Sequence, residues 1–238
     1  MILWVVAATV SYAIKGLCGF ANTLVFTTIM SFGTANANIS PIDLLMGYPA
    51  NVVLAWNNRK SLDPKVYVPL SALVLAGSIP GALLLKNVDV RAIKLVFGVV
   101  VVLLGAEMLS QEYRKQQARA SKLLLALIGV AGGALCGLFG VGALLAAYVS
   151  RVTDNTAAFK ANISAVFIVD NTFRIILYSA LHLLTLDTVK MALILAPFVL
   201  LGGFLGMKCS RRMDEKLVRK LMSVLLVLSG LSLILKNL

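Results

Sequence analysis

The sequence is poor in charged residues and in residues that bind metals. Charged residues make up 13% of the 238, and His182 is the single histidine, whereas a soluble domain has roughly 25% charged residues. The three cysteines, Cys18, Cys136 and Cys209, have neither a C-x-x-C nor a Cys/His spacing, so the sequence predicts no metal site. It also lacks the patterns typical of P-loop ATPases, kinases, zincins and serine hydrolases. We therefore expect no enzyme, no metal or other cofactor, and no ATPase within this chain.

Long apolar stretches fill most of the chain instead. Hydrophobic residues make up 60% of it and the mean hydropathy is +0.93, whereas a soluble domain has about 45–50% apolar residues. Several runs of about 17 or more apolar residues follow one another with short polar joints, which predicts an all-α polytopic protein in a lipid bilayer. The net charge of +12 lies in the joints, where the positive-inside rule explains it without a nucleic-acid partner.

The second half of the sequence repeats the first. At an offset of 121, six positions of the opening run recur: Leu3, Ala13, Gly16, Leu17, Gly19 and Leu24 match Leu124, Ala134, Gly137, Leu138, Gly140 and Leu145. At an offset of 125, Gly77 and Gly81 match Gly202 and Gly206. We therefore divide one integral membrane domain into a first repeat (1–115), a cytoplasmic linker (116–122) and a second repeat (123–238).

Glycines interrupt the first apolar run of each repeat. Residues 2–32 as one helix would extend for roughly 46 Å, whereas the bilayer core is about 30 Å thick. The run is interrupted at Gly16 and Gly19, and each half is too short to cross the membrane alone. Two interpretations remain open for 2–32 and for the equivalent run 123–150. Each is either one long kinked helix or a re-entrant helical hairpin with its tip at the glycines.

Basic residues indicate which joints face the cytoplasm. Lysines and arginines gather in 59–65, 111–122 and 208–220, and the positive-inside rule places such joints on the cytoplasmic side. If each repeat has one hairpin and three further spans, the second repeat is inverted and both termini lie outside. We therefore expect two inverted repeats, each a re-entrant or broken helix plus three transmembrane helices. The basic residues of 86–94 do not fit, because this arrangement places them outside.

Inverted repeats with broken helices are typical of transporters, in which the substrate binds near the midplane where the repeats meet. A half-helix that begins near Gly19 and another near Gly140 would point their N-termini at this site, which suits a small anion. The alternative is that these glycines only allow close helix packing, as we expect for the pairs Gly77/Gly81 and Gly202/Gly206. The candidate substrate-binding residues lie at the breaks or are polar residues in apolar spans: Lys15, Gly16, Cys18, Gly19, Asn22, Asn51, Cys136, Gly137, Gly140, Asn162 and Arg174.

For several polar residues in the apolar spans we consider specific roles. Lys15 is the one charged residue among the first 42, and an ammonium group within a membrane is costly without an anionic partner, so we expect it to contact the substrate. Asp170 and Arg174 are four residues apart on one span and form either an ion pair or a gate. Cys18 and Cys136 either contact a sulfur-containing substrate or are inert buried thiols.

Together these features resemble the TauE/SafE family of membrane transporters over essentially the full length of the chain. The resemblance rests on Gly16-Leu17-Cys18-Gly19, on Gly137-Leu138-Phe139-Gly140-Val141-Gly142, and on the glycine pairs 77/81 and 202/206 before a basic joint. Phe20-Ala21-Asn22 stands where the family commonly has glycines. The resemblance implies a multi-pass carrier in the bacterial inner membrane for sulfite, thiosulfate, sulfonates such as sulfoacetate, or related organic anions. A secondary carrier of this kind would couple to protons or sodium.

Two functions of other classes stay open. A membrane thiol relay also has inverted halves with one cysteine in each. Here, however, Cys18 aligns with Phe139, Cys136 aligns with Lys15, and neither cysteine follows a proline. An anion channel would show conductance without saturable coupled uptake.

Overall fold

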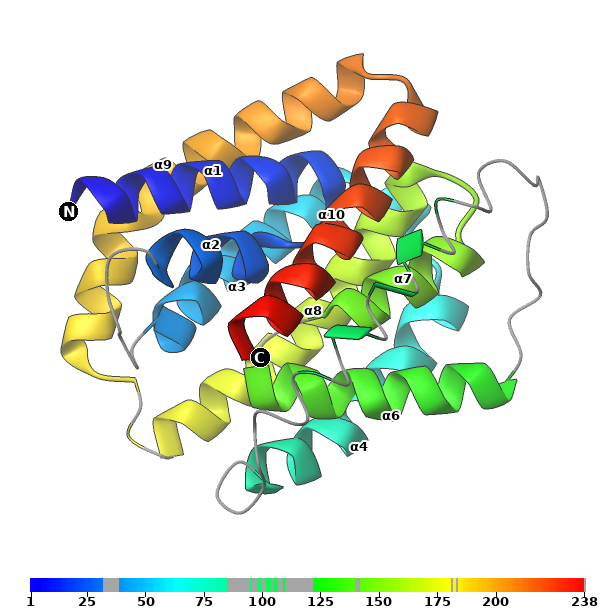
Figure 1. Cartoon of the computed structure of the whole chain (residues 1–238), viewed down its shortest axis with the longest axis horizontal. Helices are drawn as coiled ribbons and strands as arrows, with labels where there is room; N and C mark the ends of the chain where they lie inside the picture. Colours follow the sequence, from blue (N-terminus) through cyan, green and yellow to red (C-terminus); the bar gives the residue numbers. More distant parts are fainter. Residues whose placement is uncertain are drawn as a thin grey trace.

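The computed structural model describes residues 1–31, 39–84, 122–139, 142–180 and 184–237, together with residues 95, 98, 99, 102, 103, 105, 106, 109 and 182. Every regular element within this part of the chain is a helix (Figure 1), as predicted. In chain order these helices are α1 (Ile2–Cys18), α2 (Asn22–Ser31), α3 (Ile39–Asn57), the short 3-10 helix η1 (Arg59–Ser61), α4 (Pro64–Leu84), α6 (Lys122–Phe139), α7 (Ala143–Val152), α8 (Thr156–Ala180), α9 (Leu186–Arg212) and α10 (Glu215–Asn237).

The outer surface is apolar and several charged side chains lie inside. Of the described helices, α8 and α9 are each long and apolar enough to cross a membrane, and α1 is a shorter apolar helix. α9 exposes large apolar side chains such as Leu193 and Phe204, whereas Lys15 and Arg174 are buried. This distribution is expected when the surface faces lipid and the charged groups face the interior of the helix bundle.

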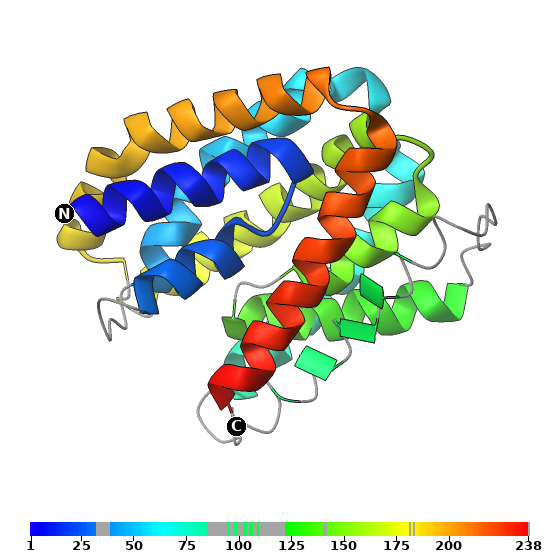
Figure 2. The ribbon, with the colours of Figure 1, turned by 45° about the horizontal axis from the view of Figure 1, so that its top comes forward.

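The first apolar run forms a helical hairpin. α1 ends at Cys18, and α2 begins at Asn22 and turns back beside α1 (Figures 1 and 2). Gly19 has a φ of +90°, a left-handed conformation that costs glycine little, and its N–H donates to the Lys15 carbonyl oxygen at 2.6 Å. For 2–32 the structure therefore has the hairpin and not one kinked helix.

Each hairpin helix packs along a helix from the other half of the chain. α1 lies against α9, and α6 lies against α4. Glycines make both contacts close: a Cβ on Gly206 would overlap the Ala13 carbonyl oxygen of α1, and one on Gly77 would overlap the Val130 carbonyl oxygen of α6. Such small-residue contacts let helix backbones approach one another within a membrane. The packing role that we expected for Gly77 and Gly206 is confirmed.

The two halves are arranged as counterparts. α1 and α6 run in opposite directions in both views (Figures 1 and 2), and α3 packs against α8. Buried apolar side chains form two clusters. One gathers mainly α1, α2, α3 and α9, with Tyr12 and Phe26, whereas the other gathers mainly α4, α6, α7 and α8, with Leu70 and Leu145. Each cluster therefore combines helices of one half mainly with one helix of the opposite half, α9 in the first cluster and α4 in the second.

Three joints gather at one end of the bundle. Residues of the α3–α4, α7–α8 and α9–α10 joints, among them Asn58, Asn155 and Met213, line one polar cavity. Lys160 also lines it, and its Nζ donates to the Gly16 carbonyl oxygen at 2.9 Å and to Ser210 Oγ at 2.7 Å. The basic clusters 59–65 and 208–220, which we expect on the cytoplasmic side, lie at and beside the α3–α4 and α9–α10 joints. The basic residues of 86–94, and 111–121 of the central linker, lie outside the described residues.

Candidate functional site

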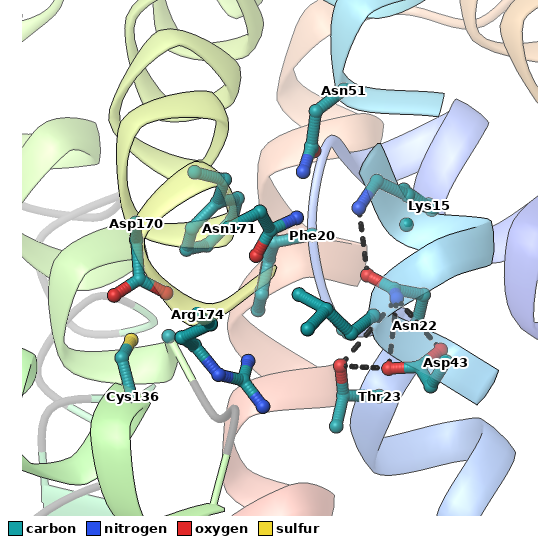
Figure 3. Close-up of a pocket in the computed structure, with 15 residues that line it drawn as sticks. Lys15, Phe20, Asn22, Thr23, Asp43, Asn51, Cys136, Asp170, Asn171 and Arg174 are labelled. Atoms are coloured by element: carbon teal, nitrogen blue, oxygen red, sulfur yellow. Dashed lines mark hydrogen bonds between the residues drawn. The ribbon is translucent and has the colours of Figure 1, made fainter. Parts of the chain in front are cut away.

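A buried cavity lies between the α1–α2 break, α3 and the helices α6, α7 and α8 (Figure 3). Its volume is about 40 Å³. Both halves of the chain contribute to its wall: Lys15, Phe20, Ala21, Asn22, Thr23, Asp43, Leu44, Gly47, Asn51, Cys136, Gly142, Phe167, Asp170, Asn171 and Arg174.

Lys15 brings a positive charge to the cavity from the last turn of α1. Its side chain is 2% exposed, and its Nζ donates to Asn22 Oδ1 at 2.9 Å. The ring centroids of Tyr12 and Phe167 each lie 5.8 Å from Nζ. An ammonium group has three N–H donors, and this is its single hydrogen bond among the described residues. Lys15 therefore has donors left for a ligand.

Asp43 of α3 is held by three donors from the hairpin. Its carboxylate accepts hydrogen bonds from Tyr12 Oη at 3.1 Å, from Asn22 Nδ2 at 3.1 Å and from Thr23 Oγ1. Figure 3 shows Asn22 between Lys15 and Asp43, bonded to both. This network fixes the start of α2 to α3 at the edge of the cavity.

Arg174 of α8 brings a second positive charge from the other half of the chain. One of its terminal nitrogens donates to the Tyr178 hydroxyl at 2.9 Å and to Ser40 Oγ at 3.3 Å. Arg174 Nε is buried and has no hydrogen-bond partner within the part of the chain that the structure describes, and the same holds for Asn51 Oδ1. Buried polar atoms nearly always have a partner, so these two atoms in the cavity wall point to a bound ligand or water.

Asp170 and Arg174 do not form the ion pair that their spacing allowed. Among the described residues no ion pair joins them, and Figure 3 shows their charged groups pointing apart. Asp170 Oδ1 instead lies 3.0 Å from Ser78 Oγ of α4. Both residues line the cavity, so each remains available to what binds there.

Several wall residues of the first half have a partner in the wall from the second half at a nearly constant separation in sequence. Two pairs of wall residues are separated by the repeat offset of 121, and three further pairs by 123: Lys15/Cys136 and Ala21/Gly142, then Leu44/Phe167, Gly47/Asp170 and Asn51/Arg174. In three of these pairs one member is charged and its counterpart is neutral. The cavity therefore lies where the halves face each other, but its charges are not distributed symmetrically.

A family model described as "Sulfite exporter TauE/SafE" matches residues 3–233, which is nearly the whole chain. The chain belongs to the TauE/SafE family. Membership in TauE/SafE makes it a membrane transporter of sulfur-containing anions and not an enzyme, so the resemblance and the membrane location are confirmed. No curated protein and no solved structure matches the chain.

The cavity brings together five of the residues predicted to bind substrate. They come from α1, α2, α3, α6 and α8: Lys15, Asn22, Asn51, Cys136 and Arg174. The two half-helices also begin at its wall, α2 at Asn22 and α7 just after Gly142, three residues later than expected in each case.

The structure places other predicted residues elsewhere. A Cβ on Gly16 would overlap the Gly203 carbonyl oxygen, so Gly16 lies at the α1–α9 contact. This agrees with the alternative that Gly16 serves helix packing. Gly19 faces Phe159 and Lys160, and Cys18 is buried in an apolar cluster without a disulfide.

Of the three remaining predicted residues, the structure places only Asn162 away from the cavity. Asn162 accepts from the Asp63 N–H at 3.0 Å and donates to the Ser61 carbonyl oxygen at 3.3 Å, at the polar joints. Gly137 lies on α6, and the structure does not describe its surroundings. Gly140 lies outside the described residues.

Our sequence reasoning missed Asp43, Thr23 and Phe167 as wall residues. Asp43 had a usable signal, because an acidic residue at the start of an apolar span is rare and commonly functional. Thr23 and Phe167 had none, since nothing in the sequence shows which face of a helix meets the cavity.

Proposed function

We propose that this protein is a secondary transporter of small sulfur-containing anions across the bacterial inner membrane, and that the anion binds in the cavity beside Lys15. Sulfite, thiosulfate and small sulfonates are the substrates we favour. The observation that carries this proposal is a buried lysine, 2% exposed, with one hydrogen bond and donors left over. A buried cation of this kind requires an anion or strong acceptors nearby.

Other groups in the wall add to the attraction for an anion. Arg174 Nε has a buried N–H without a partner in the described part of the chain, and a charge-assisted bond to an oxyanion would satisfy it. The N-termini of α2 and α7 begin at the wall, and the first N–H groups of a helix favour negative charge. These groups come from both halves, so a bound anion would bridge them.

The size of the cavity favours the smaller anions. One water molecule needs roughly 10–15 Å³ of such space, so about 40 Å³ holds about three waters. That is comparable to a pyramidal or tetrahedral oxyanion. Sulfoacetate and longer organic anions would require the cavity to widen.

The arrangement of the halves supports a carrier with inverted repeats at 1–115 and 123–238, joined by the linker 116–122. α1 and α6 run in opposite directions (Figure 2), and equivalent wall positions meet at one cavity. In carriers built this way the repeats rock against each other around a central site, which opens it to each side in turn. The same features give no support to a thiol relay, because Cys136 lines the cavity whereas Cys18 does not.

A substrate screen on purified protein tests this function. Thermal shift and isotope uptake would be measured with sulfite, thiosulfate, sulfate, taurine, sulfoacetate and short carboxylates. We expect saturable uptake of sulfite, thiosulfate or a small sulfonate and little response to short carboxylates. The double variant Cys18→Ser, Cys136→Ser should retain transport. Conductance without saturable uptake would instead indicate a channel. If the double variant abolishes an electron-transfer activity to periplasmic thiols, the thiol relay is favoured.

A further inference from the structure

We propose that Asp170 carries a proton that enters and leaves the site together with the substrate anion, so that this protein is a proton–anion symporter. The inference rests on the proposed function, because it takes the same cavity as the anion site. It adds a second binding site, for a proton taken from water on one side of the membrane and released on the other.

With every group ionised, the charged side chains of the described cavity wall cancel before any substrate binds. Among the described residues four charged side chains line it, two of them positive and two negative: Lys15 and Arg174, then Asp43 and Asp170. Their exposed fractions are only 2–4%, so water compensates little of any added charge. A monovalent anion therefore brings one uncompensated negative charge into a buried space, which is costly. One proton that binds with the anion restores neutrality.

The carboxylates of Asp43 and Asp170 differ in how many hydrogen-bond donors surround them. The Asp43 carboxylate accepts hydrogen bonds from Asn22 Nδ2 and Thr23 Oγ1, and it shares the single Tyr12 hydroxyl hydrogen with the Asp43 carbonyl oxygen. These donors suit an ionised carboxylate. Within the described part of the chain, the one hydrogen-bond partner of Asp170 is Ser78 Oγ. Asp170 is therefore the carboxylate that can accept a proton without breaking a network.

Ser78 suits a protonated Asp170. Ser78 Oγ lies 2.9 Å from the Gly133 carbonyl oxygen and 3.0 Å from Asp170 Oδ1, yet a hydroxyl has only one hydrogen to donate. If Asp170 is ionised, Ser78 donates to one of the two oxygens and the other contact lacks a hydrogen. If Asp170 is protonated, it donates to Ser78 Oγ, and Ser78 donates to Gly133. Both contacts are then hydrogen bonds.

The groups that face Asp170 are consistent with this role. From its own helix Arg174 lies one turn away, from α6 Cys136 lines the same part of the wall, and α4 contributes the uncharged Ser78. Lys15 and Asp43 face it across the cavity from α1 and α3. An anion bound to Lys15 and Arg174 places a negative charge near Asp170 and offsets the two positive charges. Both effects favour protonation of Asp170.

The test uses the full-length protein in proteoliposomes, with the membrane potential clamped by potassium and valinomycin. The probe is radiolabelled methanesulfonate, a small monovalent anion that stays ionised near neutral pH and cannot carry the proton itself. With an alkaline interior, one-to-one symport should accumulate the probe about tenfold for each pH unit. A pH dye inside the vesicles should report one proton entering per anion.

The variant Asp170→Asn separates binding from coupling. Its amide N–H can donate to Ser78 Oγ as a protonated carboxyl group does, so exchange of external labelled for internal unlabelled probe should persist while accumulation driven by the pH gradient is lost. Asp187→Asn, an exposed residue in the first turn of α9, is the control and should keep both. Three results would overturn the inference: gradient-driven accumulation in Asp170→Asn, wild-type uptake without proton entry, or wild-type uptake driven by sodium. Absence of exchange in the wild type with every anion screened would mean that the proposed function itself is wrong.

Discussion

Lys15 and Asp43 are joined through one amide and not by direct contact. Asn22 accepts from Lys15 Nζ at 2.9 Å and donates to Asp43 Oδ1 at 3.1 Å. Asp43 has two other donors, Tyr12 Oη and Thr23 Oγ1, so it is satisfied without the ammonium. The arrangement holds Lys15 at the break of the hairpin and leaves its charge free to attract an anion.

Lys65 and Lys190 should lie on opposite sides of the membrane. They are equivalent residues of the two predicted repeats, 125 positions apart, and both are exposed. Lys65→Cys and Lys190→Cys would be made with Cys209→Ser, because Cys209 is the exposed native thiol and Cys18 and Cys136 are buried. An impermeant thiol reagent added to intact cells should label only Lys190→Cys. Labelling of both from one side would contradict the inverted arrangement.

Gly16→Ala should destabilise the protein, and Gly203→Ala should not. A Cβ on Gly16 would overlap the Gly203 carbonyl oxygen, whereas nothing lies within 4 Å of a Cβ on Gly203. Overpacking typically costs about 1–3 kcal/mol, which exceeds the gain of about 1 kcal/mol from replacing a helical glycine. The midpoint of thermal unfolding in detergent measures this. Equal midpoints for the two variants would show that α1 and α9 are not packed as described.

Gly47→Ala should weaken anion binding while leaving the fold intact. Its Cβ would lie 3.5 Å from Tyr12 Oη, 3.7 Å from Asn22 Nδ2 and 3.8 Å from Asn171 Nδ2, which are ordinary contacts. The new methyl group lies in the cavity wall and takes space from a site of about 40 Å³. We expect a reduced affinity for thiosulfate with an unchanged unfolding midpoint. An unchanged affinity would indicate that the anion binds away from α3.

Ala21→Gly should be tolerated or stabilising, and Ala21→Val should be harmful. Ala21 has a φ of 74°, a conformation that costs an L-residue about 1–2 kcal/mol and glycine almost nothing. A β-branched residue is worse there than alanine. Thermal unfolding and expression level measure the effect. If valine proves as stable as glycine, the break between α1 and α2 differs from the one described.

The sequence predicted those features that depend on the chemistry of a single residue: the break of the hairpin, one binding residue and the close helix contacts. Gly19 supplied the break, because glycine favours the left-handed conformation that ends α1. Lys15 was predicted to bind substrate because a lone cation in an apolar run needs a partner, and it lies at the cavity wall. Gly77 and Gly206 predicted close helix contacts, which the structure has.

The sequence could not predict which face of each helix lines the cavity. Asn162 and Asn171 are both amides on α8, yet Asn171 lines the cavity and Asn162 binds the polar joint. Gly16 and Cys18 lie at the break, but each faces a neighbouring helix or an apolar cluster. Which residues share a site depends on how helices from the two halves cross, and this follows from packing across the whole bundle.

The most direct test of the central claim is the affinity of Lys15→Met for thiosulfate and methanesulfonate. Methionine keeps the length of the side chain and removes the charge and the N–H donors. Loss of a charge-assisted hydrogen bond should cost about 1.5–3 kcal/mol, a tenfold to hundredfold loss of affinity, whereas the exposed control Lys65→Met should bind as the wild type does. Both variants must first give the size-exclusion profile of the folded protein. An anion that binds Lys15→Met as tightly as the wild type would contradict the account, because the site would then lie away from this lysine.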